Sequence, residues 1–372
     1  MIQGILELDN RGGGHLRRRQ AGYVKDRSDP LVPPALLRRF GLRPGDEIEG
    51  EPGRGRGGPQ LEKIVKVNGV DPATLADRPD FSRLTAMHPD ELLRLEVPGK
   101  PGPVDYTNRV IDLICPFGKG QRAMIVSPAK AGKTMVLQAI AEGVRHNYPA
   151  ALLFILLVDE RPEEVFEMEA AGIGEVIASS FDHPPAQHVA LAELTQERAR
   201  RRVEMGQDVV LIVDSLTRLA RAYNSVVAGS GRTLSGGVDA QAMERPKRFF
   251  GGARKVAPAQ GGGSLSIIAT ALIETGSKMD QLIFEEFKGT GNSELVLSRD
   301  LSERRVFPAI DLVASGTRKE ELLLSPEGLA ASRALRQRIA RIPPLAAMND
   351  LLTDLKRYPT NAELIKKLAG GS

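Results

Sequence analysis

The stretch RAMIVSPAKAGKTM, from Arg122 to Met135, decides the fold of this 372-residue chain. An apolar strand, Ala123–Val126, runs into a loop of small residues, and Gly132, Lys133 and Thr134 stand where a helix is predicted to begin. A strand, loop and helix in this order form a phosphate-binding P-loop, in which backbone N–H groups and the positive end of the helix face the phosphates. The pattern predicts that Lys133 reaches the β and γ phosphates of ATP and that the Thr134 hydroxyl ligates Mg²⁺.

One position departs from the usual P-loop pattern, which begins with glycine. Ser127 stands in that place, and Pro128 stiffens the loop that follows it. A lysine that merely begins a helix is the competing interpretation, but such a lysine opposes the helix dipole. We therefore predict a P-loop despite the missing glycine.

Two further predicted strands end on charged residues. The strand 208–213 ends in Asp214, in the place of a Walker B carboxylate that holds Mg²⁺ through water, although an N-cap of the next helix would look the same. The strand 151–158 ends in Asp159, Glu160 and Arg161, at the edge where α/β sheets bind ligands. Glu160 is a candidate to orient or deprotonate the attacking water, and a solvated loop carboxylate is the alternative.

The wider pattern predicts three regions. Residues 110–372 alternate buried-strand runs with helical segments, such as Thr134–Arg145, and have a helical tail, which indicates an α/β domain with a parallel-sheet core. Residues 1–70 have short alternating apolar segments broken by Gly, Pro and Arg, a pattern typical of a small β-barrel. Residues 71–109 are polar and Pro-rich, and we expect a linker with one helical stretch at Asp90–Leu95.

Composition narrows the class of protein. A hydrophobic fraction of 41% with 26% charged residues is typical of a soluble globular protein, and no apolar run suits a membrane span or a signal peptide, so we expect a cytoplasmic protein without membrane contact. The one cysteine, Cys115, excludes an internal disulfide and a cysteine-rich zinc site. The net charge of +4 is compatible with nucleic acid, while 4% aromatic residues leave little for base stacking.

Read together, several segments closely resemble the Rho family of bacterial transcription termination factors. The segments are PFGKGQRAMIVSPAKAGKTM (Pro116–Met135), LLVDERPEEV (Leu156–Val165), DSLTRLARAYN (Asp214–Asn224), SGGVDAQAMERPKRFFGGAR (Ser235–Arg254), ATALIETGSKMDQLIFEEFKGTGN (Ala269–Asn292) and RRVFPAIDLVASGTRKEEL (Arg304–Leu322). The likeness covers nearly the whole chain. The P-loop of that family also lacks the leading glycine, so Ser127 favours this family over the related rotary ATPases.

The resemblance implies a RecA-like P-loop ATPase domain behind an OB-fold-like barrel, assembled as a homohexameric ring with ATP between subunits. Within it, Glu160 would activate water and Arg161 would contact the γ-phosphate region. The implied nucleotide pocket comprises Gly118, Lys119, Gly120, Gln121, Arg122, Ala123, Lys130, Ala131, Gly132, Lys133, Thr134 and Met135.

The same resemblance implies residues that act between subunits. Phe307 resembles the residue that packs on adenine, and Arg318 the arginine finger offered to the neighbouring subunit. Arg305 and Lys288 would support it across the same interface, and ordinary surface salt bridges are the alternative for both. Such a finger neutralises charge on the transferred phosphoryl group.

Two segments resemble the RNA-contacting loops of the ring pore. Residues 230–237, with Arg232 and Thr233, resemble the Q-loop, and residues 275–280, with Gly276, Ser277 and Lys278, resemble the R-loop. Glycines permit close backbone approach, and a lysine meets a phosphate as a point charge. Without the P-loop, both segments would be interpreted as ordinary flexible loops.

The barrel departs from the family. Arg11–Arg17 replaces a pattern that contains aromatic residues, and Leu31 and Leu61 occupy other expected aromatic positions. Stacking is worth about 1–3 kcal/mol per base, so their loss predicts no high-affinity pyrimidine site. Arginines such as Arg17 would contact RNA phosphates in place of the lost stacking, and such contacts do not distinguish one base from another. An arginine-rich solvated loop is the alternative.

The resemblance therefore predicts an RNA-dependent ATP hydrolase, a translocase or helicase that releases nascent RNA from RNA polymerase in transcription termination. Its implied partners are single-stranded RNA, the RNA polymerase elongation complex and further copies of the chain. One alternative is a related ring ATPase that acts on protein or on a rotor. Another is an RNA-binding paralogue that does not terminate transcription.

Overall fold

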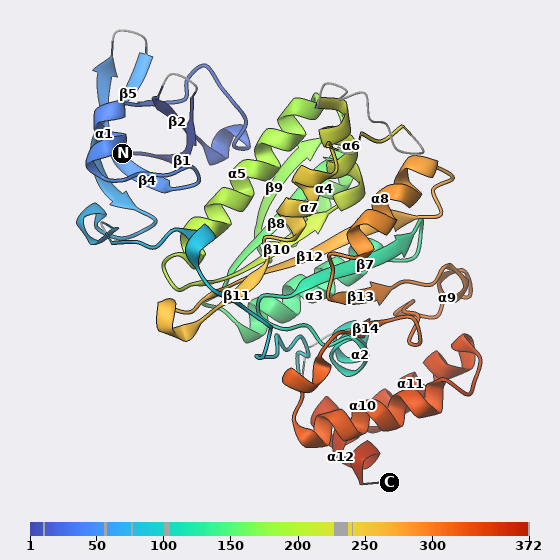
Figure 1. Ribbon diagram of the computed structural model, residues 1–372. Helices are drawn as coiled ribbons and strands as arrows, with labels where there is room; N and C mark the ends of the chain where they lie inside the picture. Colours follow the sequence, from blue (N-terminus) through green and yellow to red (C-terminus); the bar gives the residue numbers. More distant parts are fainter. Residues whose placement is uncertain are drawn as a thin grey trace.

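The computed structural model describes residues 1–9, 12–55, 58–75, 77–99, 105–226, 237–239 and 241–370. A small barrel near the N-terminus lies beside a large α/β part, and a group of helices lies at the C-terminal end (Figure 1). The barrel closes in the order β1-β2-β3-β5-β4. Its strands are β1 (Ile2–Leu8), β2 (Gly14–Arg17), β3 (Leu31–Val32), β4 (Glu47–Gly55) and β5 (Gly58–Val67), and helix α1 (Pro34–Arg39) follows β3.

The barrel has its own apolar core. Leu6, Leu16, Ile48 and Leu61 are fully buried inside it, and polar side chains lie between them along the strands. Such alternation places one side of each strand toward the core and the other toward water. The small barrel that the sequence predicted is confirmed.

The large sheet has the order β14-β13-β7-β12-β10-β8-β9. All neighbours in this order pair in parallel except β14, which pairs antiparallel with β13 at the edge of the sheet. Two short strands lie off this order: β11 pairs antiparallel with β12, and β6 pairs antiparallel with β11. The bounds are β6 (Ala86–Met87), β7 (Arg122–Pro128), β8 (Leu152–Glu160), β9 (Glu175–Ser180), β10 (Asp208–Asp214), β11 (Arg254–Val256), β12 (Ser264–Ile273), β13 (Ser293–Val296) and β14 (Gly316–Thr317).

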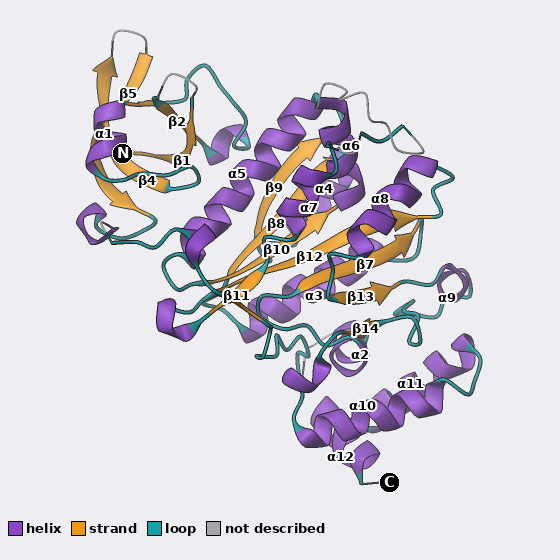
Figure 2. Ribbon diagram, viewed as in Figure 1, coloured by secondary structure: helices purple, strands orange, loops and turns teal. Residues whose placement is uncertain are grey.

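Helices cover both faces of this sheet (Figure 2). In β8, Leu156 belongs to the core beneath one group of helices, while its neighbours Ile155 and Leu157 belong to the core beneath the other. The first group is α5 (Pro185–Val203), α6 (Leu216–Val226), α7 (Glu244–Phe250) and α8 (Lys278–Lys288), and the second includes α2 (Thr107–Ile114), α3 (Lys133–Asn147) and α4 (Pro162–Ala170). The predicted α/β fold class with a parallel core is confirmed.

The C-terminal helices α10 (Pro326–Ile339), α11 (Pro344–Arg357) and α12 (Asn361–Ala369) extend the second core, and the short α9 (Arg299–Glu303) precedes them. Arg109 of α2 fastens them, because its guanidinium donates to the Leu355 and Tyr358 carbonyls at 2.9 and 2.7 Å. Helix α2 begins at Thr107, so it crosses the boundary that the sequence suggested at residue 109. None of the helices in the described ranges is long and apolar enough to cross a membrane.

Two local features differ from the sequence-based expectation. The helix expected at Asp90–Leu95 is wrong, because Leu93 N donates to the Phe117 carbonyl at 2.8 Å and Leu92 forms a bridge with Gly118. Buried Leu93 and Leu95 flank exposed Arg94, which is the alternation of an extended chain. The edge strand β9 was not predicted.

The barrel docks on helix α5 through the turn that carries Gly45. Gly45 has φ +86°, and a Cβ there would lie 2.3 Å from the Glu197 carbonyl carbon and 2.4 Å from Arg198 N. Glycine is therefore required for two reasons, the left-handed backbone and direct contact with the backbone of α5.

We expect Gly45→Ala to lower the free energy of unfolding by about 1–3 kcal/mol more than Gly41→Ala, because only the first forces atoms into packed backbone. Gly41 has φ +57° and nothing within 4 Å of an added Cβ, so it isolates the backbone cost. Urea unfolding of the whole chain gives both values. Equal losses would contradict the docking geometry.

Candidate active site

The P-loop connects β7 to α3 at the carboxyl edge of the sheet. Two left-handed residues shape it, Lys130 with φ 63° and Gly132 with φ 87°, and Gly132 directly precedes α3. Ser127, in the place of the usual glycine, is buried, and its Oγ donates to the Pro128 carbonyl at 3.0 Å. The strand, loop and helix order that the sequence predicted is therefore present.

Lys133 lies against two carboxylates from other strand ends. Its Nζ is 2.6 Å from Asp214 Oδ2 and 3.5 Å from Glu160 Oε2. Burial alone would lower the pKa of Lys133, but the two carboxylates outweigh it and raise the pKa above its ordinary value. The ammonium therefore stays charged, as contact with phosphate requires.

Asp214 is held at the end of β10 by strand β12. Thr270 Oγ1 donates to Asp214 Oδ1 at 2.6 Å. The next helix is not capped by Asp214, since Arg218 N donates to Ser215 Oγ at 3.2 Å. The competing interpretation of Asp214 as an N-cap is thus not supported.

Glu160 is 1% exposed, which is unlike a solvated loop carboxylate. Burial raises its pKa above the ordinary value of a glutamate, although Lys133 opposes the shift. Arg218 of α6 reaches Glu160 Oε1 with a nitrogen at 3.2 Å. A buried carboxylate with a raised pKa, beside a lysine for phosphate, is suited to accept a proton from water.

Sequence reasoning missed Arg218 and Thr270. Arg218 comes four residues after Asp214, on the first turn of the helix that leaves the edge, and this spacing was an available signal. Thr270 lies in the middle of an apolar strand, and only its register beside β10 and β7 reveals its role.

Helix α9 and the loop that follows it lie over the P-loop. Ser302 Oγ donates to the Lys130 carbonyl at 3.1 Å, and a Cβ on Gly132 would lie 3.5 Å from the Phe307 ring. The ring is 37% exposed, so a flat face beside the phosphate loop remains open. Arg305 belongs to this same loop and is exposed, as are Arg161 and Met135.

The segment Gly118–Ala123 lies at the other end of β7. Lys119 pairs with Glu91 and with Asp208 at 2.9 Å, and Gly120 N donates to Ser266 Oγ at 2.8 Å. Because β7 has seven residues at about 3.3 Å each, about 20 Å separate this segment from the P-loop. Within one chain, the structure does not bring the two parts of the expected pocket together.

Arg318 also lies at the amino edge. Its backbone N donates to the Asn292 carbonyl at 2.9 Å, and Asn292 Oδ1 accepts from Arg122 N at 2.9 Å. Lys288, at the end of α8, lies near the same segment, whereas Arg305 lies at the P-loop. The guanidinium of Arg318 is exposed and has no hydrogen bond or ion pair within the described ranges, and it cannot span the sheet to its own P-loop.

The loop expected to contact RNA joins β12 to α8. Gly276 has φ 77°, Ser277 Oγ accepts from Asp280 N at 3.4 Å, and Lys278 is exposed. Asp280 is buried and receives two hydrogen bonds, at 2.7 and 2.6 Å, from Arg221 of α6. The helix that carries Arg218 therefore also anchors this loop. Arg232 and Thr233 lie outside the described residues.

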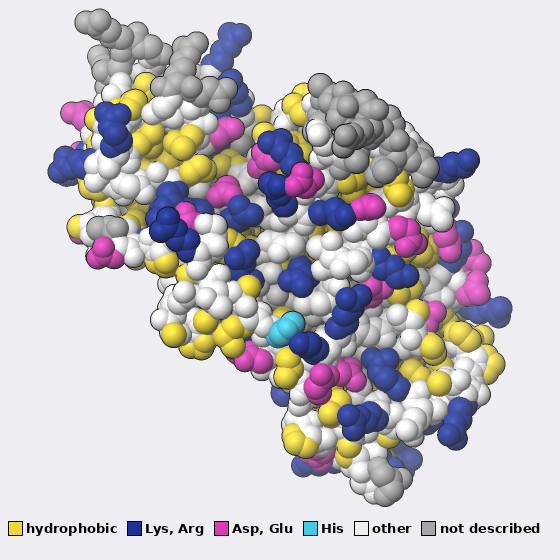
Figure 3. Space-filling model, viewed as in Figure 1, with side chains coloured by type: hydrophobic (Ala, Val, Ile, Leu, Met, Phe, Trp, Pro, Cys, Tyr) yellow, Lys and Arg dark blue, Asp and Glu magenta, His cyan; other side chains and the backbone are white. Residues whose placement is uncertain are grey.

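In the barrel, Arg17 has a structural role that differs from the expected phosphate contact. Its side chain is buried and pairs with Glu7 and with Asp29 at 2.6 Å. Of the two leucines at expected aromatic positions, Leu61 is in the core and Leu31 is 37% exposed. Figure 3 shows basic side chains scattered among acidic ones over one face of the molecule.

No group of three or more His, Cys, Asp or Glu side chains suited to a metal occurs among the residues that the structure describes. Mg²⁺ needs no such cage beside a nucleotide, because it keeps water ligands and is held by phosphates and one or two protein oxygens. The Thr134 hydroxyl and the Asp214 carboxylate supply oxygens of this kind, so the donor set fits the ion.

Family comparisons match both the α/β part and the barrel of this chain. Residues 107–317 match the nucleotide-binding domain of the ATP synthase alpha/beta family, and residues 2–74 match the RNA-binding domain of the Rho termination factor. An ATPase from the type III secretion system of pathogenic bacteria superposes with a TM-score of 0.63 at 23% identity, covering 84% of this chain and 93% of that one, which shows the fold alone.

Curated relatives are more similar. Transcription termination factor Rho of Gemmatimonas aurantiaca is 55% identical over 96% of this chain, which spans 49% of that relative's length. The Rho factor of Haemophilus influenzae is 50% identical, and the match covers 98% of this chain and 86% of that one.

We expect Glu160→Gln to retain ATP binding and to lower ATP hydrolysis by about 10²–10⁴-fold, the usual contribution of a general base. Because burial raises the pKa of Glu160, hydrolysis by the unaltered protein should fall on acidification at a higher pH than an ordinary glutamate would give. Phosphate release across pH and binding of a fluorescent nucleotide measure the two properties. Glu163→Gln, at an exposed neighbouring position, is the control, and full turnover by Glu160→Gln would contradict the assignment.

Proposed function

The chain belongs to the transcription termination factor Rho family, and on this premise we propose that it hydrolyses ATP in response to single-stranded RNA. Hydrolysis would drive movement along RNA and release of the transcript from the RNA polymerase elongation complex in the cytoplasm. The observation that carries the proposal is the split of the ATPase machinery. Lys133, Glu160 and Asp214 meet at one edge of the sheet, while Arg318 is exposed at the opposite edge.

This split calls for a second subunit. If one subunit turns its amino edge toward the P-loop of the next, Arg318 reaches the γ-phosphate of a nucleotide that it cannot reach in its own chain. Lys288 and the segment Gly118–Ala123 would stand on the same side as the finger. A closed ring of identical subunits satisfies every such interface, and we propose a hexamer.

The chemical step follows from the side chains. Water attacks the γ-phosphorus, Glu160 takes the proton, and the bond to the ADP oxygen breaks. Lys133 leaves its carboxylate partners for the phosphates, and Arg318 of the neighbour neutralises the charge that develops. Thr134 and Asp214 would hold Mg²⁺, which supplies further positive charge to the phosphates.

Coupling to RNA would run through α6. Arg221 holds the loop of Lys278 through Asp280, and Arg218 on the same helix contacts Glu160. RNA that moves Lys278 would therefore shift the general base. Phosphates and a lysine meet without base specificity.

A ring ATPase that acts on protein is the other candidate, since a secretion ATPase shares the fold. The match of the barrel to a Rho RNA-binding domain favours RNA.

We expect ATP turnover to depend on single-stranded RNA and to be lost in Arg318→Ala by about 10³-fold or more. Arg333→Ala, another exposed arginine, should leave turnover unchanged. Mixing Lys133→Ala with Arg318→Ala subunits should restore part of the activity, because some interfaces then pair an intact finger with an intact P-loop. Phosphate release is measured for each protein and for the mixture. Equal turnover without RNA would contradict RNA dependence, and no rescue on mixing would contradict the finger in trans.

For the barrel, we expect weak, salt-sensitive RNA binding with little preference for cytosine, because contacts with phosphates release counterions. Leu31→Phe should tighten binding by about fivefold or more, since a stacked base is worth about 1–3 kcal/mol. Leu8→Phe, at another exposed leucine of the barrel, is the control. Fluorescence anisotropy on C-rich and mixed oligomers at several salt concentrations measures these affinities. Tight, salt-tolerant binding to C-rich RNA by the unaltered chain would refute this account of the barrel.

A further inference from the structure

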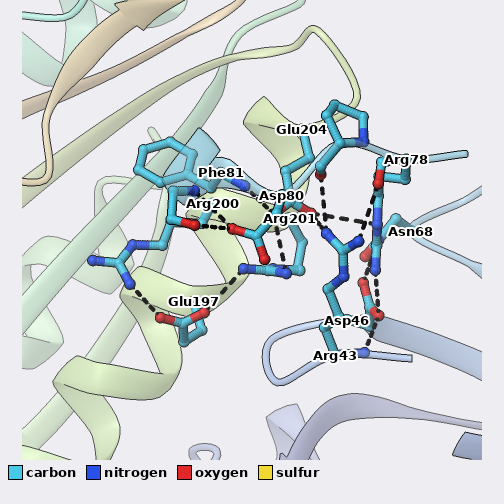
Figure 4. Close-up of polar contacts among 12 residues, drawn as sticks. Arg43, Asp46, Asn68, Arg78, Asp80, Phe81, Glu197, Arg200, Arg201 and Glu204 are labelled. Atoms are coloured by element: carbon cyan, nitrogen blue, oxygen red, sulfur yellow. Dashed lines mark hydrogen bonds and ion pairs between the residues drawn. The ribbon is translucent and has the colours of Figure 1, made fainter. Parts of the chain in front are cut away.

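The segment that leaves the barrel, here called the connector and defined as residues 77–93, is anchored by buried charges at its start. Arg78, whose side chain is 4% exposed, donates to both carboxylate oxygens of Asp46 at 2.5 and 3.0 Å and lies 3.3 Å from Glu204 at the end of α5 (Figure 4). Phe81 N donates to the same Glu204 at 2.8 Å. Separating the partners of such a buried network would leave an uncompensated charge in the interior, which costs free energy. The contacts therefore hold this end of the connector in place.

The far end of the connector is held by backbone hydrogen bonds along the amino edge of the sheet. Strand β6 pairs with β11, Lys119 N donates to the Glu91 carbonyl at 2.9 Å, and Leu93 N donates to the Phe117 carbonyl at 2.8 Å. Pro89 lies against Gly118, where an added Cβ would be 2.7 Å away. The short stretch between β6 and Glu91 is therefore fixed on both sides.

His88 projects from this fixed stretch to the loop of Arg318. Lys319 Nζ lies 2.9 Å from His88 Nε2. Lys319 has φ 59° and ψ 39°, a left-handed conformation that is uncommon for a residue other than glycine. In the described part of the chain neither side chain has another hydrogen bond or ion pair, so each is the other's partner.

Arg318 thus stands between two anchors. Its own backbone N donates to the Asn292 carbonyl on one side, and Lys319 is held by His88 on the other. Resting on the proposed function, in which Arg318 acts in trans, we propose that His88 is a positioning residue for Arg318 and acts through Lys319. The connector would then link the RNA-binding barrel to the residue that completes the neighbouring active site.

The contact has a defined protonation state. A lysine ammonium only donates hydrogen bonds, so Nε2 of His88 must be unprotonated to accept one. Several charged groups lie on the elements around His88. They are Asp90 and Glu91 of the connector, Lys255 of β11, Lys119, and Arg318 and Glu320 of the loop that carries Arg318. Lys255 pairs with Asp90 and Glu91, and Lys119 with Glu91 and Asp208, so these charges already compensate one another.

RNA-stimulated ATP turnover of the full chain tests the proposal. We expect His88→Ala to lower kcat by about tenfold with little change in KM for ATP, because a displaced catalytic group costs rate and not ground-state binding. His88→Gln supplies an uncharged acceptor and should restore most of kcat. His146→Ala, an exposed histidine on α3, should behave as the unaltered protein.

The double variant separates positioning from general damage. If His88 acts through Arg318, then Arg318→Ala with and without His88→Ala should have the same turnover. A further tenfold loss in the Arg318→Ala background, or full activity of His88→Ala alone, would overturn the proposal. A failure of the proposed function looks different, since Arg318→Ala would then leave turnover unchanged.

Discussion

Parallel register between neighbouring strands is the constraint on which the active site depends. Asp214 pairs with Leu157 three residues before Glu160, and Thr270 lies opposite Ile125 in the strand that leads into the P-loop. A slip of one residue would turn these side chains to the opposite face of the sheet. Lys133, Glu160 and Asp214 come from distant parts of the sequence. They meet because their neighbouring parallel strands end at the same edge of the sheet. The same alignment places the residues at and before the starts of the strands, including Gly120 and Arg122, at the other edge of the sheet.

Sequence reasoning correctly predicted motifs that lie within one strand and the loop after it. It was weaker for features that depend on which separate segments lie close together in the fold. The P-loop and the strands that carry Asp214 and Glu160 could be predicted, since each motif lies within one strand and its following loop. The family resemblance grouped Gly118–Ala123 with Lys133 in one nucleotide pocket, yet within one chain a full strand separates them. Arg17 was expected to contact phosphates or to lie in a solvated loop, whereas its side chain is buried and pairs with Asp29 and Glu7. Thr270 could not have been found, since nothing distinguishes a polar residue in an apolar strand until its neighbours are known.

The junction of barrel and ATPase part is made largely of charge. Glu47 of β4 lies 3.3 Å from Arg198 of α5, and Glu204 is fully buried among arginines. Apolar packing tolerates small rotations, but hydrogen-bonded ions require particular directions and distances. Such a junction specifies one orientation of the barrel, and with it the path of the chain toward the loop that carries Arg318.

Gly45 has a consequence for how this architecture can be rebuilt. A barrel grafted from another protein would need a residue without a side chain at this turn, followed by an acid in the place of Asp46, or it would not seat on α5. The boundary between the two folds is therefore a poor point for exchanging modules. Designed chimeras should therefore transfer the barrel together with the last turns of α5, because the two surfaces fit each other.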